Sequence, residues 1–290
     1  MKKVQFGQFD IVHSHPETWF INLCHSSRSK KCVWVHTYHT MYFEEDNPEG
    51  LEPYEVEMNQ CLLKVASKAD VRLCVSDWFH DYLLRNHSIS TEVVHNGVDL
   101  DFCDKANPAR FVDKYGVRNF VLFVGYLDPI KNPAMFVNLA AEMPEIKFVM
   151  IGRNLDAFQL ANRFNVRIPR NLFVMREMTH SDLIDAISAC KAYVMTSKRE
   201  GFPTSLLEAM GLRKPVVVPN HSGCREIVSD DDYGFLYRSG SFSDLVEKTK
   251  NALLSKEVGE KARERVEKNF DWQIIAKKLD RIYDLSKRTE

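Results

Sequence analysis

The sequence predicts an α/β protein built from two doubly wound domains, and three features of the chain support this. Short apolar runs rich in β-branched residues alternate with segments of helical length, a pattern typical of parallel sheets with helices on both faces. The alternation occurs in two blocks, which a polar turn at residues 95–111 separates. The length of 290 residues also suits two domains, since about 150 residues is a common domain size.

Each block has its own set of expected strands. The first block contains four buried strands, at 9–13, 32–36, 71–76 and 91–95. The second contains six, at 120–125, 146–152, 171–175, 192–197, 215–219 and 234–237. Because strands and helices alternate, we expect parallel pairing with right-handed crossovers in both sheets.

Helical segments fill the spaces between these strands. They are expected at 52–68, 77–86, 132–142, 155–164, 180–189, 204–212 and 223–229, and throughout the tail from about 241 to 287. The tail has a predicted break at residues 270–272. The Asn96-Gly97 turn and Pro108 mark the boundary region. We therefore expect domains at 1–108, joined by the C-terminal helix 271–290, and at 109–270.

Composition excludes several classes of protein. Lys and Arg number 39 against 40 Asp and Glu, a formal charge of −1, which lacks the basic excess of a nucleic-acid-binding protein. No apolar run approaches the roughly 18 residues of a membrane span, and the first ten residues lack the apolar region of a signal peptide. The seven cysteines are scattered without CxxC spacing. This favours buried thiols in a cytoplasmic protein over disulfides or structural zinc.

The strongest chemical signal follows the predicted strand that ends at Ser197. Pro203 suits the first turn of a helix, so the N–H groups of the next residues would face the carboxyl edge of the sheet with the positive end of the helix dipole. Glu200 lies just before this helix and Glu208 inside it. Either glutamate alone could be a surface residue. Together, at the carboxyl end of a strand, they predict a site for a phosphate or diphosphate.

The segment EGFPTSLLEAMGLRKPVVVP, at 200–219, resembles the signature of retaining GT-B glycosyltransferases of family 4, the glycosyl transferases group 1. Further segments resemble that family in the same order along nearly the whole chain. They are DIVHSH at 10–15, Thr37-Tyr38-His39-Thr40, CVSDW at 74–78, HNGVD at 95–99, VGYLDPIKNP at 124–133, GCREIV at 223–228, GFL at 234–236 and FDW at 270–272.

The resemblance implies the GT-B fold, in which two doubly wound Rossmann-like domains face a central cleft. Family members usually begin several strand–helix units before the segment found here at 10–15, so the resemblance implies a truncated N-terminal domain. It also implies metal-independent, retaining transfer of a sugar from a nucleoside-diphosphate-sugar to an acceptor hydroxyl. No cofactor is expected, because the nucleotide-sugar is a substrate. The base (uracil, guanine or adenine) and the acceptor (a glycan, a lipid or a small molecule) stay open.

The resemblance also assigns roles to individual residues. Glu208 would bind the ribose hydroxyls, and Glu200 hydroxyls of the transferred sugar near its C3. Lys131 would neutralise the leaving diphosphate, and His39 would face the donor sugar, so Glu200, Lys131 and His39 form the implied catalytic set. The implied donor-binding residues are Gly125, Tyr126, Lys131, Arg153, Met178, Glu200, Gly201, Phe202, Pro203, Thr204, Ser205 and Glu208.

Two departures from the family pattern affect these assignments. The family's arginine after the first strand of this domain is Tyr126 here. Arg153 and Arg199 are the candidates for replacing its charge. The short first domain leaves a second function open, that of a non-catalytic nucleotide-sugar-binding subunit whose missing units come from a partner chain. Retention of the tail that docks on the first domain in this family favours self-sufficiency.

Other signals have simpler explanations. Asp99-Leu100-Asp101 matches a D-x-D metal motif, but in a turn it is better explained by turn formation and helix capping. His13 and His15 lack further metal ligands, so no metal is expected. A glycosidase using Glu200 and Glu208 is disfavoured, since a helix N-terminus and cations would lower the pKa of both carboxylates. The basic tail could lie on the inner face of a membrane, but a helix packed on the first domain explains it better.

Overall fold

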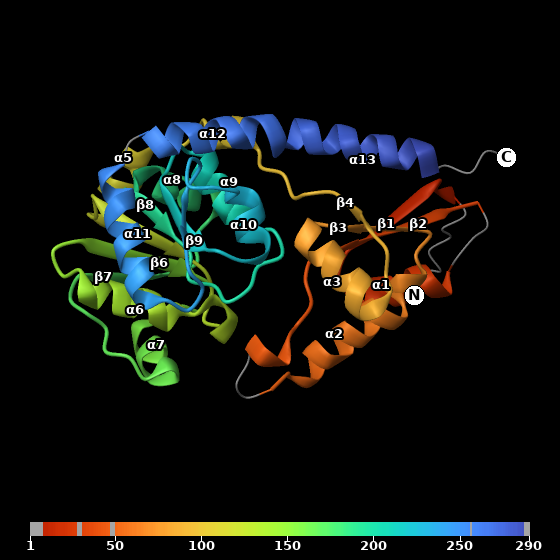
Figure 1. The fold of residues 1–290 in the computed structure, drawn as a ribbon, viewed down its shortest axis with the longest axis horizontal. Helices are drawn as coiled ribbons and strands as arrows, with labels where there is room; N and C mark the ends of the chain where they lie inside the picture. The colour runs from red at the N-terminus through yellow and green to blue at the C-terminus, as the bar shows by residue number, and fades with distance from the viewer. Residues whose placement is uncertain (1–7, 28–30, 47–49, 256, 287–290) are drawn as a thin grey trace. The chain divides into compact units, whose positions relative to one another are not determined.

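A computed structural model describes residues 8–27, 31–46, 50–255 and 257–286 of the protein (Figure 1). The chain divides into two compact units. The first unit is Met1–Asn96 with Gln273–Glu290, and the second unit is Gly97–Trp272. All ten predicted strands are confirmed, with ends within a few residues of those expected.

The first unit contains a four-stranded, fully parallel sheet whose strands follow one another in chain order. Its strands are β1 (Ile11–Ser14), β2 (Val33–Tyr38), β3 (Val71–Cys74) and β4 (Glu92–Val93). Its helices are α1 (Thr18–Ser26), α2 (Pro53–Lys64), α3 (Asp77–His87) and α13 (Trp272–Ser286), with short 3₁₀ turns at η2 (Glu44–Asp46) and η3 (Ala66–Lys68).

Side chains alternate between the two faces of this sheet, as strand geometry requires. On one face Trp34 and Tyr38 of β2 pack with Leu62 and Phe79 from the helices that follow the strands. On the other face Val33 and Val35 pack with apolar side chains of α13. The C-terminal helix α13 therefore covers this face of the first sheet.

The second unit contains a six-stranded parallel sheet in the order β10-β9-β8-β5-β6-β7. Its strands are β5 (Phe120–Val124), β6 (Lys147–Gly152), β7 (Leu172–Arg176), β8 (Ala192–Val194), β9 (Val216–Pro219) and β10 (Phe235–Tyr237). Its helices are α4 (Leu100–Cys103), α5 (Pro108–Tyr115), α6 (Pro133–Glu142), α7 (Ala157–Phe164), α8 (His180–Ala189), α9 (Thr204–Gly211), α10 (Ser222–Val228), α11 (Phe242–Leu254) and α12 (Glu257–Asn269), with a 3₁₀ turn at η4 (Pro129–Lys131).

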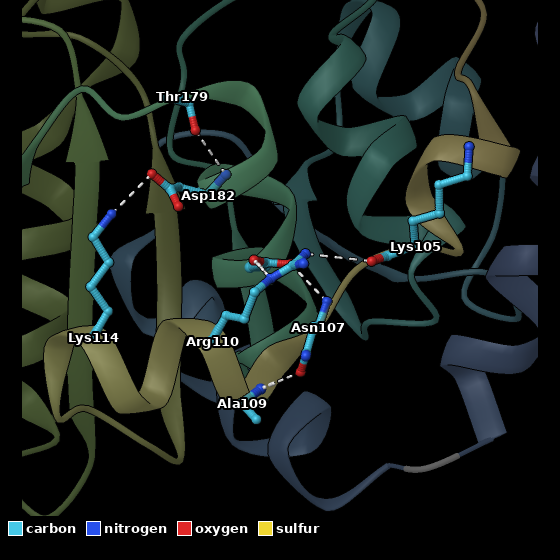
Figure 2. Close-up of polar contacts among 8 residues, drawn as sticks. Lys105, Asn107, Ala109, Arg110, Lys114, Thr179 and Asp182 are labelled. Carbon is cyan, nitrogen blue, oxygen red and sulfur yellow. Dashed lines mark hydrogen bonds and ion pairs between the residues drawn. The ribbon is translucent and has the colours of Figure 1, made fainter.

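The division between the units falls after Asn96 rather than after residue 108, because α4 and α5 pack within the second unit (Figure 2). Arg110 of α5 donates to the buried Asp185 of α8, with Nε and Oδ2 2.6 Å apart. The backbone N–H of Asn107 donates to the same carboxylate at 2.7 Å, and Lys114 pairs with Asp182 at 3.1 Å. The sequence predicted neither α1 nor α5, and of α4 it predicted only the cap at Asp99.

Two expectations from composition are also tested by the structure. All seven cysteines are buried and unpaired with one another. Across the described ranges, no helix combines the length and the apolar character that a membrane crossing requires.

Candidate functional site

The second sheet reverses its winding between β5 and β8. Strands β5, β6 and β7 are added in one direction, and β8, β9 and β10 in the other. The connections that leave β5 and β8 therefore diverge to opposite faces, and in sheets of this kind the crevice between them binds ligands. The two loops at this switch point are the ones that carry Lys131 and Glu200.

Backbone and hydroxyl contacts fasten these two loops to each other. Thr196, just after β8, donates its hydroxyl to the carbonyl oxygens of Lys131 and Asn132 at 3.0 and 2.9 Å. The N–H of Lys198 donates to the carbonyl of Ile130 at 2.7 Å. The turn that carries Lys131 is also capped by Asp128, which accepts from the Ile130 N–H at 2.8 Å. The position of Lys131 is therefore fixed by β8 as well as by its own strand.

Lys131 and Glu200 form an ion pair across the switch point. Nζ of Lys131 lies 2.6 Å from Oε1 of Glu200, and the two side chains are 19% and 10% exposed. Burial alone would lower the pKa of Lys131, but the adjacent Glu200 carboxylate outweighs it and holds the pKa above its usual value. The Tyr126 ring, where the family has an arginine, lies with its centroid 5.5 Å from Nζ. Lys131 thus keeps its positive charge at neutral pH, next to the Glu200 carboxylate.

Helix α9 begins at this pair, as the sequence predicted. Pro203 precedes its first residue, Thr204, and this N-cap residue makes no side-chain hydrogen bond to the first N–H groups of the helix. The ring of Phe202 is buried against Phe270, so only its backbone can face a ligand. The hydroxyl of Ser205 is hydrogen-bonded to Tyr193 at 2.9 Å. An uncapped helix start beside a lysine can bind an anion.

Helix α10 holds the backbone of Glu200 in place. The Glu200 N–H donates to Oγ of Ser222 at 3.3 Å, and its carbonyl accepts from the N–H of Gly223 at 3.2 Å. A Cβ on Gly223 would lie 2.0 Å from the carbonyl oxygen of Gly201, so only glycine permits this approach. The segment 223–228 stands out in the sequence only through its family resemblance, which gives no sign that it supports Glu200.

A cavity of about 770 Å³ lies at the carboxyl ends of β5, β6 and β7. Its lining includes the predicted Gly125, Tyr126 and Arg153. A Cβ on Gly152 would lie 1.7 Å from the Gly125 carbonyl oxygen. Glycine at 152 therefore allows the ends of β5 and β6 to approach closely where they line the cavity. Other polar residues of the lining were not predicted from the sequence, namely Asn154, Asp156, Gln159, Arg163, Arg176 and Glu177. Neither Met178 nor Arg199 belongs to the lining, although Met178 directly follows it in sequence.

Glu208 lies in the last turn of α9 and is paired with a residue that the sequence analysis did not single out. Nε2 of His180 lies 2.7 Å from Oε1 of Glu208, whose side chain is 13% exposed. Burial raises the pKa of Glu208, and the contact with His180 only partly offsets this. The expectation that the helix start and cations would lower this pKa was therefore wrong. Glu208 lies too far along the helix to benefit from its N-terminus, since the dipole effect fades within the first turn.

The first unit gathers four histidines at the carboxyl ends of β1 and β2. Nδ1 of His15 lies 2.8 Å from Nε2 of the predicted His39. His13 is bonded through both ring nitrogens, to Thr37 at 2.7 Å and to the Tyr283 hydroxyl at 2.6 Å. Burial lowers the pKa of His13 and His39 to about 4 and that of His36 to about 3. These rings are therefore neutral hydrogen-bonding groups at physiological pH.

The D-x-D segment proves to be a helix cap. The carboxylate of Asp99 accepts from the N–H of Phe102 at 2.8 Å and starts α4, as turn and capping chemistry predicted. Asp101 follows within that helix.

The sequence is similar to those of known glycosyltransferases along most of its length. Residues 104–272 match the model of the family described as glycosyl transferases group 1, and residues 1–102 match that of Glycosyltransferase Family 4. The chain is 26% identical over 309 residues to the UDP-Gal:alpha-D-GlcNAc-diphosphoundecaprenol alpha-1,3-galactosyltransferase of Escherichia coli, covering 98% of this chain and 76% of that protein. It is 25% identical over 273 residues to the D-inositol 3-phosphate glycosyltransferase of Mycobacterium sp. (strain JLS), covering 86% and 60%.

Solved structures share the fold at lower sequence identity. Sucrose-phosphate synthase from Thermosynechococcus elongatus aligns with a TM-score of 0.80 at 19% identity, over 96% of this chain and 74% of that one. HepE of Anabaena in complex with UDP and glucose aligns with a TM-score of 0.76 at 19% identity, over 96% and 78%. The predicted GT-B class, with two parallel-sheet α/β domains, is confirmed.

Proposed function

The chain belongs to the glycosyl transferases group 1 family, and from this premise we propose that it moves a sugar from a UDP-sugar to an acceptor hydroxyl with retention of anomeric configuration. The observation that carries the proposal is the buried pair of Lys131 and Glu200 at the switch point, beside the uncapped start of α9. A fixed ammonium and free N–H groups suit a diphosphate, and a carboxylate next to them suits sugar hydroxyls.

The choice of uridine for the donor rests on relatives. The name of the E. coli relative specifies UDP-Gal, and HepE was solved with UDP and glucose. Within the second unit, the 770 Å³ cavity can accommodate a part of the donor next to the diphosphate. Arg153 lines that cavity together with Tyr126, so we propose Arg153 rather than Arg199 as the second cation of the donor site.

In the proposed reaction the bond between the anomeric carbon and the diphosphate oxygen breaks. A bond from the acceptor oxygen to the same face of that carbon forms. The acceptor's proton passes to the departing phosphate oxygen, so the products are a glycoside and UDP, and no carboxylate base is needed. Lys131 and the start of α9 stabilise the negative charge that grows on the leaving group. The positive charge comes from the protein, so we propose that no divalent metal takes part.

In this proposal the two glutamates contact different parts of the donor. Glu200 contacts the transferred sugar, where positive charge develops during transfer, and its backbone is fixed for that purpose by α10. Glu208 contacts the ribose hydroxyls. His39 of the first unit contacts the transferred sugar, a role that follows from the family resemblance. Since the name of one relative includes a lipid-linked acceptor, we propose a cytoplasmic enzyme that meets glycan or lipid-linked acceptors at a membrane surface.

A ligand panel followed by turnover tests the proposal. UDP, GDP and ADP are each added to the protein in separate thermal unfolding experiments. A ligand present at about 100 times its own dissociation constant should raise the free energy of unfolding by roughly 2.7 kcal/mol. We expect UDP to give the largest rise in melting temperature. Release of UDP from a UDP-sugar by the purified chain should then increase when an acceptor is added. Tight donor binding with turnover only after a second chain is added would favour the binding-subunit alternative instead.

A further inference from the structure

The side chain of His180 contacts the carboxylate of Glu208, although His180 has no role in the proposed reaction. Nε2 of His180 lies 2.7 Å from Oε1, on a different helix from Glu208. Within the part of the chain that the structure describes, Oε2 of Glu208 has no hydrogen-bond partner. A carboxylate with one oxygen fixed presents the other in a single direction, as a specific hydrogen bond to a ligand requires.

His180 is itself held in place from two sides. It is the first residue of α8, and that helix start is capped by Thr179, which accepts from the N–H of Asp182 at 3.2 Å (Figure 2). Its ring stacks on Phe102 with centroids 4.9 Å apart and planes 12° from parallel. Stacking leaves the ring edge, with its nitrogens, free to bond in the plane.

Phe102 owes its position to the short helix α4. The Asp99 cap fixes the backbone N–H of Phe102, and α4 packs against α9. The side chain of Leu100 lies 3.0 Å from where a Cβ of Gly211 would be, so the contact between these helices is tight. Helices α4 and α8 therefore converge on the turn of α9 that carries Glu208.

We propose that His180 is a positioning residue that aims the free oxygen of Glu208 at the donor ribose, with Phe102 as the support for its ring. This inference rests on the proposed function, which gives the ribose to Glu208. The contact of His180 with Glu208 would explain why the donor site recognises the ribose specifically. His180 does not touch the ribose or the reacting atoms in this scheme, so its loss should alter ribose discrimination and leave the chemical step unchanged.

The test compares UDP with its 2′,3′-dideoxy analogue, which lacks both ribose hydroxyls. His180→Phe keeps an aromatic ring for stacking on Phe102 but removes the N–H donor. His180→Gln removes the ring but keeps an N–H donor and serves as the matched control. We expect His180→Phe to weaken UDP about three- to tenfold, as a lost hydrogen bond would, and to leave the affinity for the dideoxy analogue within twofold. His180→Gln should bind UDP within about threefold of the unaltered protein, and kcat should stay unchanged in both variants.

Three results would overturn the inference. Equal weakening of both ligands by His180→Phe would indicate a merely structural role, and no weakening of either would indicate no role. If Glu208→Ala binds UDP and the analogue with the same ratio as the unaltered protein, then Glu208 does not contact the ribose, and the proposed function fails at this point together with the inference. Phe102→Leu gives an independent check, since loss of the stack should weaken UDP in the same selective way, by a smaller factor.

Discussion

The two sheets of this protein place different chemistry at their carboxyl ends. In the first unit the described strands follow chain order without a reversal, and the polar groups at their ends are histidines bonded to one another and to hydroxyls. In the second unit the order reverses between β5 and β8, and the loops there carry the ion pair of Lys131 and Glu200. The reversal opens a crevice where charge can be both buried and available to a ligand. Neutral imidazoles suit a neutral acceptor, whereas fixed charges suit a diphosphate.

The largest effect is expected from removing the fixed cation of the second unit. Lys131→Met keeps the length of the side chain and loses its charge, so the leaving diphosphate is no longer neutralised. We expect kcat to fall by about 10²- to 10³-fold, the usual cost of losing one transition-state donor. Steady-state kinetics on the folded variant measures this.

Lys114→Met is the matched control, because Lys114 forms an exposed pair on α5 away from the switch point. It should retain full activity. A fall of less than tenfold for Lys131→Met would contradict the role given to the cation.

Acid should affect the first unit through its neutral histidines. His36 is fully buried, and its pKa falls from 6.5 in the unfolded chain to about 3. The unfolded state then binds a proton that the folded state does not, so stability is full above pH 6.5 and is lost as the pH falls. By pH 5 the loss from His36 alone is about 2 kcal/mol.

Urea unfolding at pH 7.5 and pH 5 checks this. Intrinsic fluorescence follows mainly the first unit, which holds Trp19, Trp34 and Trp78. His36→Gln should flatten the pH dependence by about the same amount. An unchanged pH dependence in the variant would exclude His36 as its source.

A smaller effect should distinguish the two arginines near the donor site. Arg153 lines the cavity and Arg199 does not. Arg153→Ala should weaken UDP binding about three- to tenfold, because an exposed arginine loses much of its interaction to solvent screening. Arg199→Ala should change it less than twofold. Calorimetric titration of UDP into both variants measures this. If Arg199→Ala weakens UDP more than Arg153→Ala does, then Arg199 is the second cation of the donor site.

The smallest effect is expected from metal removal. Because Lys131 and the start of α9 provide the positive charge, UDP affinity should survive EDTA within about threefold, or roughly 0.65 kcal/mol. A loss of tenfold or more that Mg²⁺ or Mn²⁺ restores would show that the second unit does not supply its own charge.

The sequence could predict the parts of this comparison that depend on local pattern. The strands follow short, mostly apolar runs, and α9 begins directly after Pro203, close to where the sequence predicts it. The unit boundary could not be found in this way. Asn96-Gly97 and Pro108 both signal a linker, while the contact that decides between them joins Arg110 to Asp185, 75 residues later.

In the candidate site, too, local sequence patterns were predictable and contacts between distant residues were not. Glu200, Lys131 and Glu208 stand out because of motif and spacing, but their supports come from distant loops. His180 meets Glu208 across 28 residues, and Ser222 meets Glu200 across 22. Arg163 and Arg176 reach the cavity only because β5, β6 and β7 are neighbours in the sheet. Such contacts depend on strand order, which periodicity along the chain does not encode.

The most direct test of the donor site is a titration of UDP, without its sugar, into Glu208→Ala and Glu200→Ala. The account assigns Glu208 to the ribose and Glu200 to the transferred sugar. Glu208→Ala should therefore weaken UDP about 10- to 150-fold, the cost of losing hydrogen bonds to a charged group, whereas Glu200→Ala should stay within about threefold. Weaker binding by Glu200→Ala than by Glu208→Ala would contradict this placement of the donor along α9.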